Sequence, residues 1–191
     1  ILDNLKGQFI DHLAFEASSH GLDQHRLDGV RLKAAVFTNF SNDHLDYHHT
    51  MEAYFEAKVR LFQELMGPDK YAIINADMAE CEKLLAICKN RGLPTLTFGK
   101  AGQDIRLISI IPKADSQDVL LYIEGKSYNL HLPFVGQFQV YNVMAALGAV
   151  IACGGNATQA VEACLNLKGI PGRLELAAPG IYVDYSHKPE A

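Results

Sequence analysis

The sequence predicts an α/β fold: a mostly parallel sheet flanked by helices, with a small antiparallel β subdomain. Up to Gly99, short strand-like segments alternate with amphipathic helical patterns, which is typical of parallel strands joined by crossover helices. After Gly99 the pattern changes to three short strands separated by turn residues. Two helical segments and one more strand follow, so the antiparallel part lies within the chain and not at its end.

The composition is that of a globular protein with one sizeable domain. The chain has 191 residues, of which 49% are hydrophobic and 20% charged. A net charge of −5 provides no basic surface for nucleic acid or for an anionic membrane, so neither partner is expected. The apolar runs are too short to cross a bilayer and no signal peptide opens the chain, so we expect no membrane insertion and a cytoplasmic location.

The first two expected strands each end at polar residues. The first runs from His12 to Phe15, and Glu16 stands at its end. A polar loop leading into a short helix follows, with Leu22 as its only apolar anchor. The second strand runs from Ala34 to Phe37. Because ligands bind beyond the carboxyl ends of parallel strands, both of the following loops are candidate site regions.

A strongly patterned helix is expected from Thr50 to Met66. The Thr50 hydroxyl can cap it by accepting a hydrogen bond from a backbone N–H of the first turn. Apolar residues at helical spacing form a stripe: Met51, Tyr54, Phe55, Leu61, Phe62 and Leu65. Lys58 falls inside this stripe, where an apolar residue would be expected.

The remaining elements are delimited by turn residues. Strands are expected at 71–75 and 93–98, around a helix at 79–90 that Gly92 closes in a left-handed conformation. The antiparallel strands are expected at 107–111, 119–123 and 128–132, and the turn Glu124-Gly125-Lys126-Ser127 makes the last two a hairpin. Helices at 136–153 and 158–167, a loop at 171–175 and a strand at 181–185 complete the prediction.

A lysine that faces a core has three fates. It can extend its ammonium group to water, which is its general behaviour, or it can pair with an acid. Alternatively, burial lowers its pKa, and the neutral amine can add carbon dioxide to form a carbamate, an oxygen ligand for Mg²⁺. The residues before the helix favour a metal site: Asp43, His44, Asp46, His48 and His49.

Two further groups of polar residues are candidate ligand contacts. Arg26 closes a polar run that includes Ser18 and Gln24, which suits an anionic, hydroxyl-rich ligand, although a solvated helix entry explains the run equally well. Arg173 beside a glycine can approach a phosphate, and Asp184 at a strand end can accept ribose hydroxyls. Spacing alone favours a surface salt bridge and a strand cap for this pair.

Cysteines and phosphate-binding motifs give mainly negative results. The four cysteines contain no C-x-x-C pair and are interpreted as small buried residues in a reducing compartment, not as zinc ligands or disulfides. No G-x-x-x-x-G-K-[ST] motif is present. The chain begins without methionine and stops just after a strand, so we expect it to be a piece of a longer protein.

Five motifs, in order, carry a family resemblance over essentially the whole chain. E-A-S-S-H-G-L-D-Q-H-R, T-N-F-S-N-D-H-L-D-Y-H with Y-F-E-A-K, G-Q-F-Q-V-Y-N-V-M-A-A, P-G-R-L-E and V-D-Y-S-H-K-P resemble those of the Mur ligase family, in particular its MurE type. The resemblance implies an ATP-dependent acid–amino acid ligase of peptidoglycan and cell-wall synthesis. In such a ligase the γ-phosphate passes to the carboxylate of UDP-MurNAc-L-Ala-D-Glu, and the amine of a diamino acid then displaces it. We expect meso-diaminopimelate as that substrate in preference to L-lysine.

The resemblance also assigns roles to residues of this sequence. Glu16, His44 and Lys58 match catalytic and Mg²⁺-binding positions, and Lys58 matches a carbamylated lysine. The remaining matches are to contacts of UDP-MurNAc-dipeptide (Ser18, Gln24, Arg26) and of adenine, phosphate and ribose in ATP (Asn142, Arg173, Asp184). The bare sequence leaves a helix-capping role for Asn142 as an equal alternative.

The departures from the family pattern define the expected domains. Gln139 stands where the family usually has asparagine, and the family's P-loop would precede Ile1. We expect residues 1–180 to be the central ATP-binding domain, incomplete at its N-terminus, and residues 181–191 to start the linker to a C-terminal domain. The isolated chain is expected to be inactive and to self-associate through its truncated sheet. The alternatives are a non-catalytic binding module without a P-loop and a sister ligase such as a folylpolyglutamate synthase.

Overall fold

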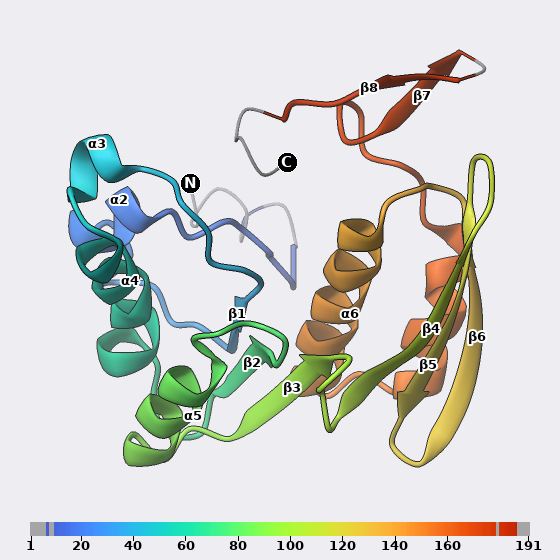
Figure 1. Ribbon diagram of the computed structural model, residues 1–191. Helices are drawn as coiled ribbons and strands as arrows, with labels where there is room; N and C mark the ends of the chain where they lie inside the picture. The colour runs from blue at the N-terminus through green and yellow to red at the C-terminus, as the bar shows by residue number, and fades with distance from the viewer. Residues whose placement is uncertain (1–6, 8–9, 179, 187–191) are drawn as a thin grey trace.

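The computed structural model describes residues 7, 10–178 and 180–186 and shows helices on both faces of a central sheet (Figure 1). The central sheet has six strands in the order β1-β2-β3-β4-β5-β6, and β7 and β8 form a separate two-stranded sheet. The strands are β1 (Ala34–Phe37), β2 (Tyr71–Asn75), β3 (Thr95–Gly99), β4 (Ile105–Pro112), β5 (Gln117–Ile123), β6 (Lys126–Leu132), β7 (Glu175–Ala178) and β8 (Ile181–Val183).

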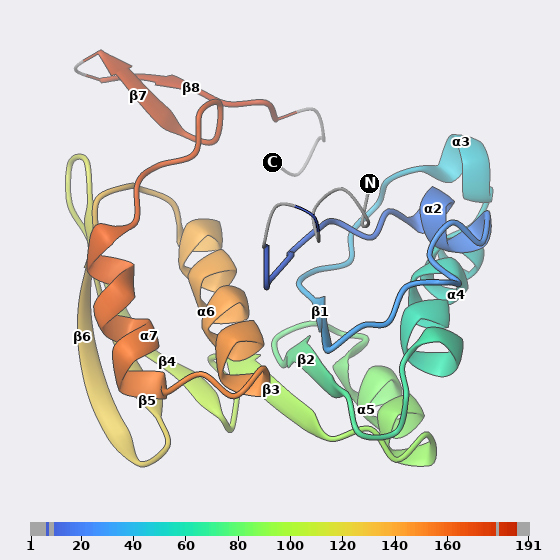
Figure 2. The ribbon, with the colours of Figure 1, turned by 180° about the vertical axis from the view of Figure 1, so that it is seen from behind.

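The helices pack on the sheet, and those between β1 and β3 in the chain connect its parallel strands. They are α2 (Ser19–Asp23), α3 (Leu45–His48), α4 (Met51–Arg60), the π-helix η1 (Leu61–Leu65), α5 (Cys81–Asn90), α6 (Gln137–Ala152), α7 (Ala157–Ala163) and the 3₁₀ helix η2 (Cys164–Asn166). In both views α2, α3, α4 and α5 lie at the β1 side of the sheet (Figures 1 and 2). The helix α6 contacts β1, β2, β3 and β4, and α7 packs against α6.

The predicted α/β architecture is confirmed. The pairs β1–β2, β2–β3 and β3–β4 are parallel, and β4–β5 and β5–β6 are antiparallel. The antiparallel strands are continuous with the parallel ones, because Phe98 pairs with Ile105 and Gly99 with Arg106. The predicted hairpin is present, but its turn has two residues, Glu124 and Gly125, both with positive φ, because Lys126 and Ser127 belong to β6.

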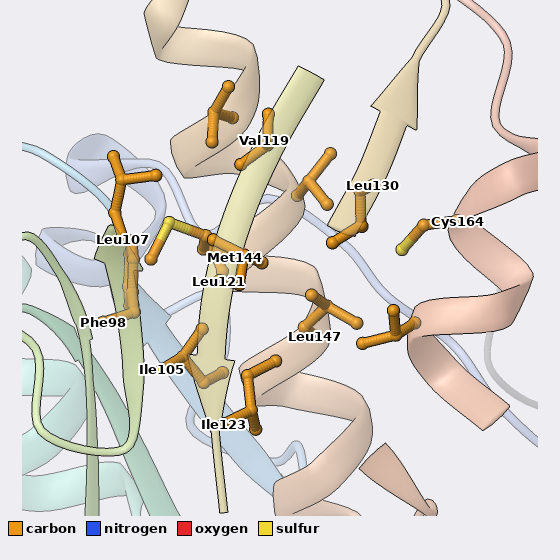
Figure 3. Packing of buried hydrophobic residues seen from close by; sticks show 14 of the residues in the cluster. Phe98, Ile105, Leu107, Val119, Leu121, Ile123, Leu130, Met144, Leu147 and Cys164 are labelled. Carbon is orange, nitrogen blue, oxygen red and sulfur yellow. The ribbon is translucent and has the colours of Figure 1, made fainter. Parts of the chain in front are cut away.

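Two hydrophobic cores lie on opposite faces of the sheet because side chains alternate along a strand. On β2, Ile73 packs with α6 and the antiparallel strands, whereas Ala72 and Ile74 pack with α4 and α5. The first core, between the antiparallel strands and α6, includes Phe98 and Met144 (Figure 3). The parallel half of the sheet is therefore covered on both faces, as parallel sheets require.

Several elements differ from the sequence prediction. Residues 12–15 are not a strand: within the described part of the chain β1 pairs only with β2, so this segment has no ladder to join. The short helix expected after the polar run is present as α2 but begins within the run, and Leu22 is its buried anchor, 1% exposed. The strand β7 was not predicted, and it pairs with β8. Of the four cysteines, Cys153 is exposed, contrary to expectation.

Three further expectations concern the whole molecule: membrane spanning, the domain boundary and self-association. No helix in the described ranges is both long and apolar enough to cross a membrane. The division between residues 180 and 181 stays a prediction, and the hairpin of β7 and β8 lies across it. Self-association also stays a prediction, which analytical ultracentrifugation would test; Leu13 and Phe15, 49% and 43% exposed, offer apolar surface near β1.

Candidate active site

The loops that follow β1 and β2 are joined at the carboxyl edge of the sheet. The Asn75 side chain, at the end of β2, donates a hydrogen bond of 2.8 Å to the Thr38 carbonyl, just after β1. The Asn75 side-chain oxygen accepts a bond of 3.0 Å from the Asp77 N–H. These bonds fix the start of the loop that carries the histidines. The candidate site therefore lies where parallel sheets bind their ligands.

Two of the three residues predicted to hold metal, His44 and Lys58, contact one buried ring, that of Tyr54 in α4. The His44 ring packs edge-on against it at 5.7 Å between centroids, and the Lys58 Nζ lies 5.2 Å from its centroid. Burial raises the pKa of Tyr54 to about 12, and the negative charges of Asp43 and Glu16 add to the shift. The fold thus brings His44 and Lys58 onto one ring from separate segments, and the charge of Glu16, from a third segment, acts on that ring.

The neighbouring histidines have different roles. His44 adopts a left-handed conformation with φ of 53°, and its N–H donates a bond of 2.9 Å to the Asp43 carboxylate. His48 is buried, shares a hydrogen bond of 2.9 Å with the Ser19 hydroxyl and stacks on Tyr54. Burial lowers the pKa of His48, which keeps the ring neutral. His49 is exposed, whereas the His44 imidazole is partly exposed and packs against the Tyr54 ring.

The residues around Tyr54 fit a metal ion in type but not in number. No group of three or more His, Cys, Asp or Glu side chains within the described ranges could hold an ion on its own. A carboxylate and an imidazole, from Glu16 and His44, would be two ligands. Lys58 is half-buried, and as a carbamate it would add an oxygen ligand to these two. The negative charges of Asp43 and Glu16, which add to the effect of burial on the pKa of Tyr54, also favour a cation here.

The residues predicted to bind the UDP-MurNAc-peptide lie together at the surface, beside α3. Ser18 caps α2 by accepting a bond of 3.1 Å from the Gly21 N–H. Arg26 donates a bond of 2.6 Å to the Gln24 side-chain oxygen, and Gln24 donates one of 3.3 Å to the Tyr47 hydroxyl. Tyr47 was not predicted from the sequence. Its hydroxyl joins the two loops of the candidate site.

The residues predicted to contact the nucleotide are linked through Gln139 at the start of α6. The buried Gln139 accepts a bond of 3.3 Å from Asn142 and donates one of 3.2 Å to the Arg173 carbonyl. The Tyr185 N–H donates a bond of 2.9 Å to the Gly172 carbonyl, which holds the segment containing Asp184 beside Arg173. Both Arg173 and Asp184 are exposed.

A cavity of about 400 Å³ opens next to this linked group. Gln139 and Asn142 are on its wall, and most of the other lining residues are apolar side chains of α6, α7 and the segment after η2. An apolar cavity with a few polar groups is the usual form of a small-molecule site. Asn142 thus faces a cavity and is not confined to helix capping.

Comparisons with known proteins agree with this geometry. Residues 1–150 match the model of the Mur ligase middle domain. The UDP-N-acetylmuramoyl-L-alanyl-D-glutamate–2,6-diaminopimelate ligase of Zymomonas mobilis is 44% identical over 186 residues, and the match covers 95% of this chain and 38% of that ligase. The chain thus spans well under half the length of this relative.

Solved structures show the same relationship. A structure of a UDP-N-acetylmuramoyl-L-alanyl-D-glutamate–2,6-diaminopimelate ligase matches with a TM-score of 0.75 and 35% identity, covering 84% of this chain and 33% of that one. An FPGS of L. casei matches with a TM-score of 0.69, covering 85% of this chain and 41% of that one. At 18% identity it shares the fold alone. With the middle-domain model matched over residues 1–150, this chain belongs to the Mur ligase family.

Proposed function

We propose that the chain is the central part of an ATP-dependent ligase that adds a diamino acid to UDP-MurNAc-L-Ala-D-Glu. The diamino acid is meso-diaminopimelate in preference to L-lysine, because the relatives named above are 2,6-diaminopimelate ligases. The whole enzyme acts in the cytoplasm, in peptidoglycan synthesis, on small-molecule substrates. Because the chain spans only 38% of the Zymomonas mobilis relative, the complete reaction belongs to the longer protein.

The observation that carries the proposal is the contact of His44 and Lys58 with the Tyr54 ring, on which the charge of Glu16 also acts. Lys58 is half-buried, and its Nζ lies 5.2 Å from the centroid of the Tyr54 ring. His44 and Glu16 provide the ligand types that complete a cation site with a lysine carbamate. A ligase that activates a carboxylate with ATP needs such a cation, because Mg²⁺ neutralises charge on the transferred phosphoryl group.

The chain's own residues divide the remaining tasks. Ser18, Gln24 and Arg26 present a hydroxyl, an amide and a guanidinium group at one surface, which suits an anionic peptide substrate. The nucleotide lies at the other end of the edge, where Asn142 faces a cavity and Arg173 and Asp184 are open to solvent. The two substrates would thus approach the Tyr54 cluster from opposite sides.

Replacing Lys58 in the full-length enzyme tests the proposal. Lys58→Ala should remove most of the ADP formation that depends on UDP-MurNAc-dipeptide and diaminopimelate, a loss of about 100-fold or more. Lys58→Arg should not restore it, since a guanidinium cannot carry a carbamate. A short-chain carboxylic acid added to Lys58→Ala should restore part of the rate by replacing the missing oxygen ligand.

The matched control is Lys83→Ala. The Lys83 Nζ also lies over an aromatic ring, 4.4 Å from the Phe55 centroid, but on the exposed side of α5. This variant loses a similar contact and should keep normal turnover. Near-normal turnover in Lys58→Ala or Lys58→Arg would contradict the assigned role.

A further inference from the structure

A carboxylate at the sheet edge, that of Asp77, accepts three hydrogen bonds from two distant segments. The backbone N–H groups of Lys100 and Ala101, after β3, donate bonds of 2.7 and 2.8 Å. The Tyr141 hydroxyl of α6 donates a third, of 2.6 Å. Burial raises the pKa of Asp77, but the three bonds outweigh it and hold the pKa below its usual value. The carboxylate is thus bound as an anion, although the residue lies at the surface.

The backbone next to this carboxylate is shaped to admit it. Gly99, the last residue of β3, has a φ of +128°, a conformation that L side chains rarely adopt. A Cβ at this position would lie only 2.6 Å from an Asp77 oxygen. Gly99 therefore provides both the turn and the space that bring the two N–H groups onto Asp77.

The bond to Tyr141 acts on the part of α6 that faces the nucleotide cavity. Successive helical residues are about 100° apart around the axis, so Tyr141 and Asn142 point in different directions. Tyr141 is held at the sheet edge by Asp77, whereas Gln139 is held on another side by the Arg173 carbonyl. Because these two bonds act in different directions, together they oppose rotation of the start of α6 about its helix axis. Burial and the bond to Asp77 also raise the pKa of Tyr141 to about 12, so its hydroxyl stays a donor.

We infer that Asp77 is a positioning residue: through Tyr141 it fixes the rotation of α6 and so the direction in which Asn142 meets the nucleotide. The inference rests on the proposed function for the identity of that nucleotide, ATP. It assigns no contact between Asp77 and a substrate. Replacing Asp77 or Tyr141 should therefore weaken nucleotide binding to the same extent, with little effect on the binding of UDP-MurNAc-dipeptide.

The test uses the full-length enzyme with Asp77→Asn, Tyr141→Phe and the double variant. Each single variant should raise the KM for ATP about tenfold, as expected for one lost hydrogen bond to a charged group. The kcat and the KM for UDP-MurNAc-dipeptide should stay within about twofold. The double variant should be no worse than the worse single one, because both remove the same connection.

The matched control is Tyr128→Phe. The Tyr128 hydroxyl also shares one partly buried hydrogen bond, of 3.0 Å with Thr158, but it lies on β6, away from Asp77. This variant should leave the KM for ATP unchanged. The inference would be overturned by an unchanged KM for ATP in Tyr141→Phe, by an equal loss in all kinetic constants, or by additive effects in the double variant.

Calorimetric titration with ADP separates this inference from the proposed function. If the wild-type enzyme forms no UDP-MurNAc-tripeptide, the proposed function fails, but Tyr141→Phe should still weaken ADP binding by the same factor of about ten. If the wild-type enzyme is active and ADP binding is equal in all variants, only the positioning role fails. A wild-type protein that binds no ADP would overturn both.

Discussion

At the scale of single residues, a neutral aromatic ring is the centre of the candidate metal site. Tyr54 contacts His44, His48 and Lys58, and burial, with a smaller contribution from the charges of Asp43 and Glu16, raises its pKa to about 12. An apolar stripe identifies Tyr54 only as a core residue. Its role depends on which segments the fold brings to it, and that information is not local.

The candidate residues fall into those that sequence motifs identify and those that only contacts identify. Lys58 stands out because a charge interrupts an apolar stripe, and Glu16 because it lies in a recognisable motif. Asp77 and Tyr141 carry no such signal: an acid in a turn and a tyrosine in a helix are common. Only the hydrogen bond between them, which joins the turn after β2 to α6, shows that they belong together.

Gly99 allows a sharp test of backbone geometry. Gly99→Ala should cost about 1–3 kcal/mol of unfolding free energy more than Gly154→Ala, measured by urea denaturation. Both glycines have positive φ, +128° and +95°, but a Cβ on Gly154 would meet nothing within 4 Å. The comparison therefore separates the collision with Asp77 from the strain of the backbone. Equal losses in the two variants would contradict it.

At the scale of elements, α4 is the helix on which the metal candidates depend. Thr50 caps it, as predicted, by accepting a bond of 3.1 Å from the Ala53 N–H. Its last turn widens into the π-helix η1, whose Leu61 and Phe62 are buried in the core with α5. The cap and the wide turn set the two ends of the element that carries both Tyr54 and Lys58.

Removing the cap should destabilise the protein measurably. Thr50→Ala should lower the free energy of unfolding by about 0.5–2 kcal/mol, because one N–H of the first turn loses its acceptor. Glu80→Ala is the control: Glu80 occupies the same position on α5 but makes no capping bond through its side chain. Its cost should be below about 0.5 kcal/mol. Circular dichroism during urea unfolding measures both, and equal costs would exclude the capping role.

The strands whose limits could be predicted lie in the part of the chain where strands and helices alternate. The limits of β1 and β2 agree with the prediction, since an apolar run between turn residues is enough to locate a buried strand. Residues 12–15 have a similar composition but no ladder within the described chain. The short strand β7 has only exposed and half-buried side chains, so no burial pattern marks it.

At the scale of the whole molecule, the sheet joins two halves of different construction. The β1–β3 half is parallel and has a core on each face, whereas β5 and β6 contribute to one core only. The halves meet at β3 and β4 through two paired positions. The sequence predicted both halves, but it could not show that they are one sheet, because that depends on this single short contact.

This junction has a consequence for the order in which the chain folds. The strands β5 and β6 are separated by two residues, Glu124 and Gly125, whereas residues 38–70 separate β1 from β2. Closing a short loop costs less entropy, so local pairing is faster than pairing through crossovers. We expect pulsed hydrogen exchange during refolding to protect β5 and β6 before β1 and β2, and simultaneous protection would contradict this order. The antiparallel meander would then be the template on which the ligand-binding half of the sheet assembles.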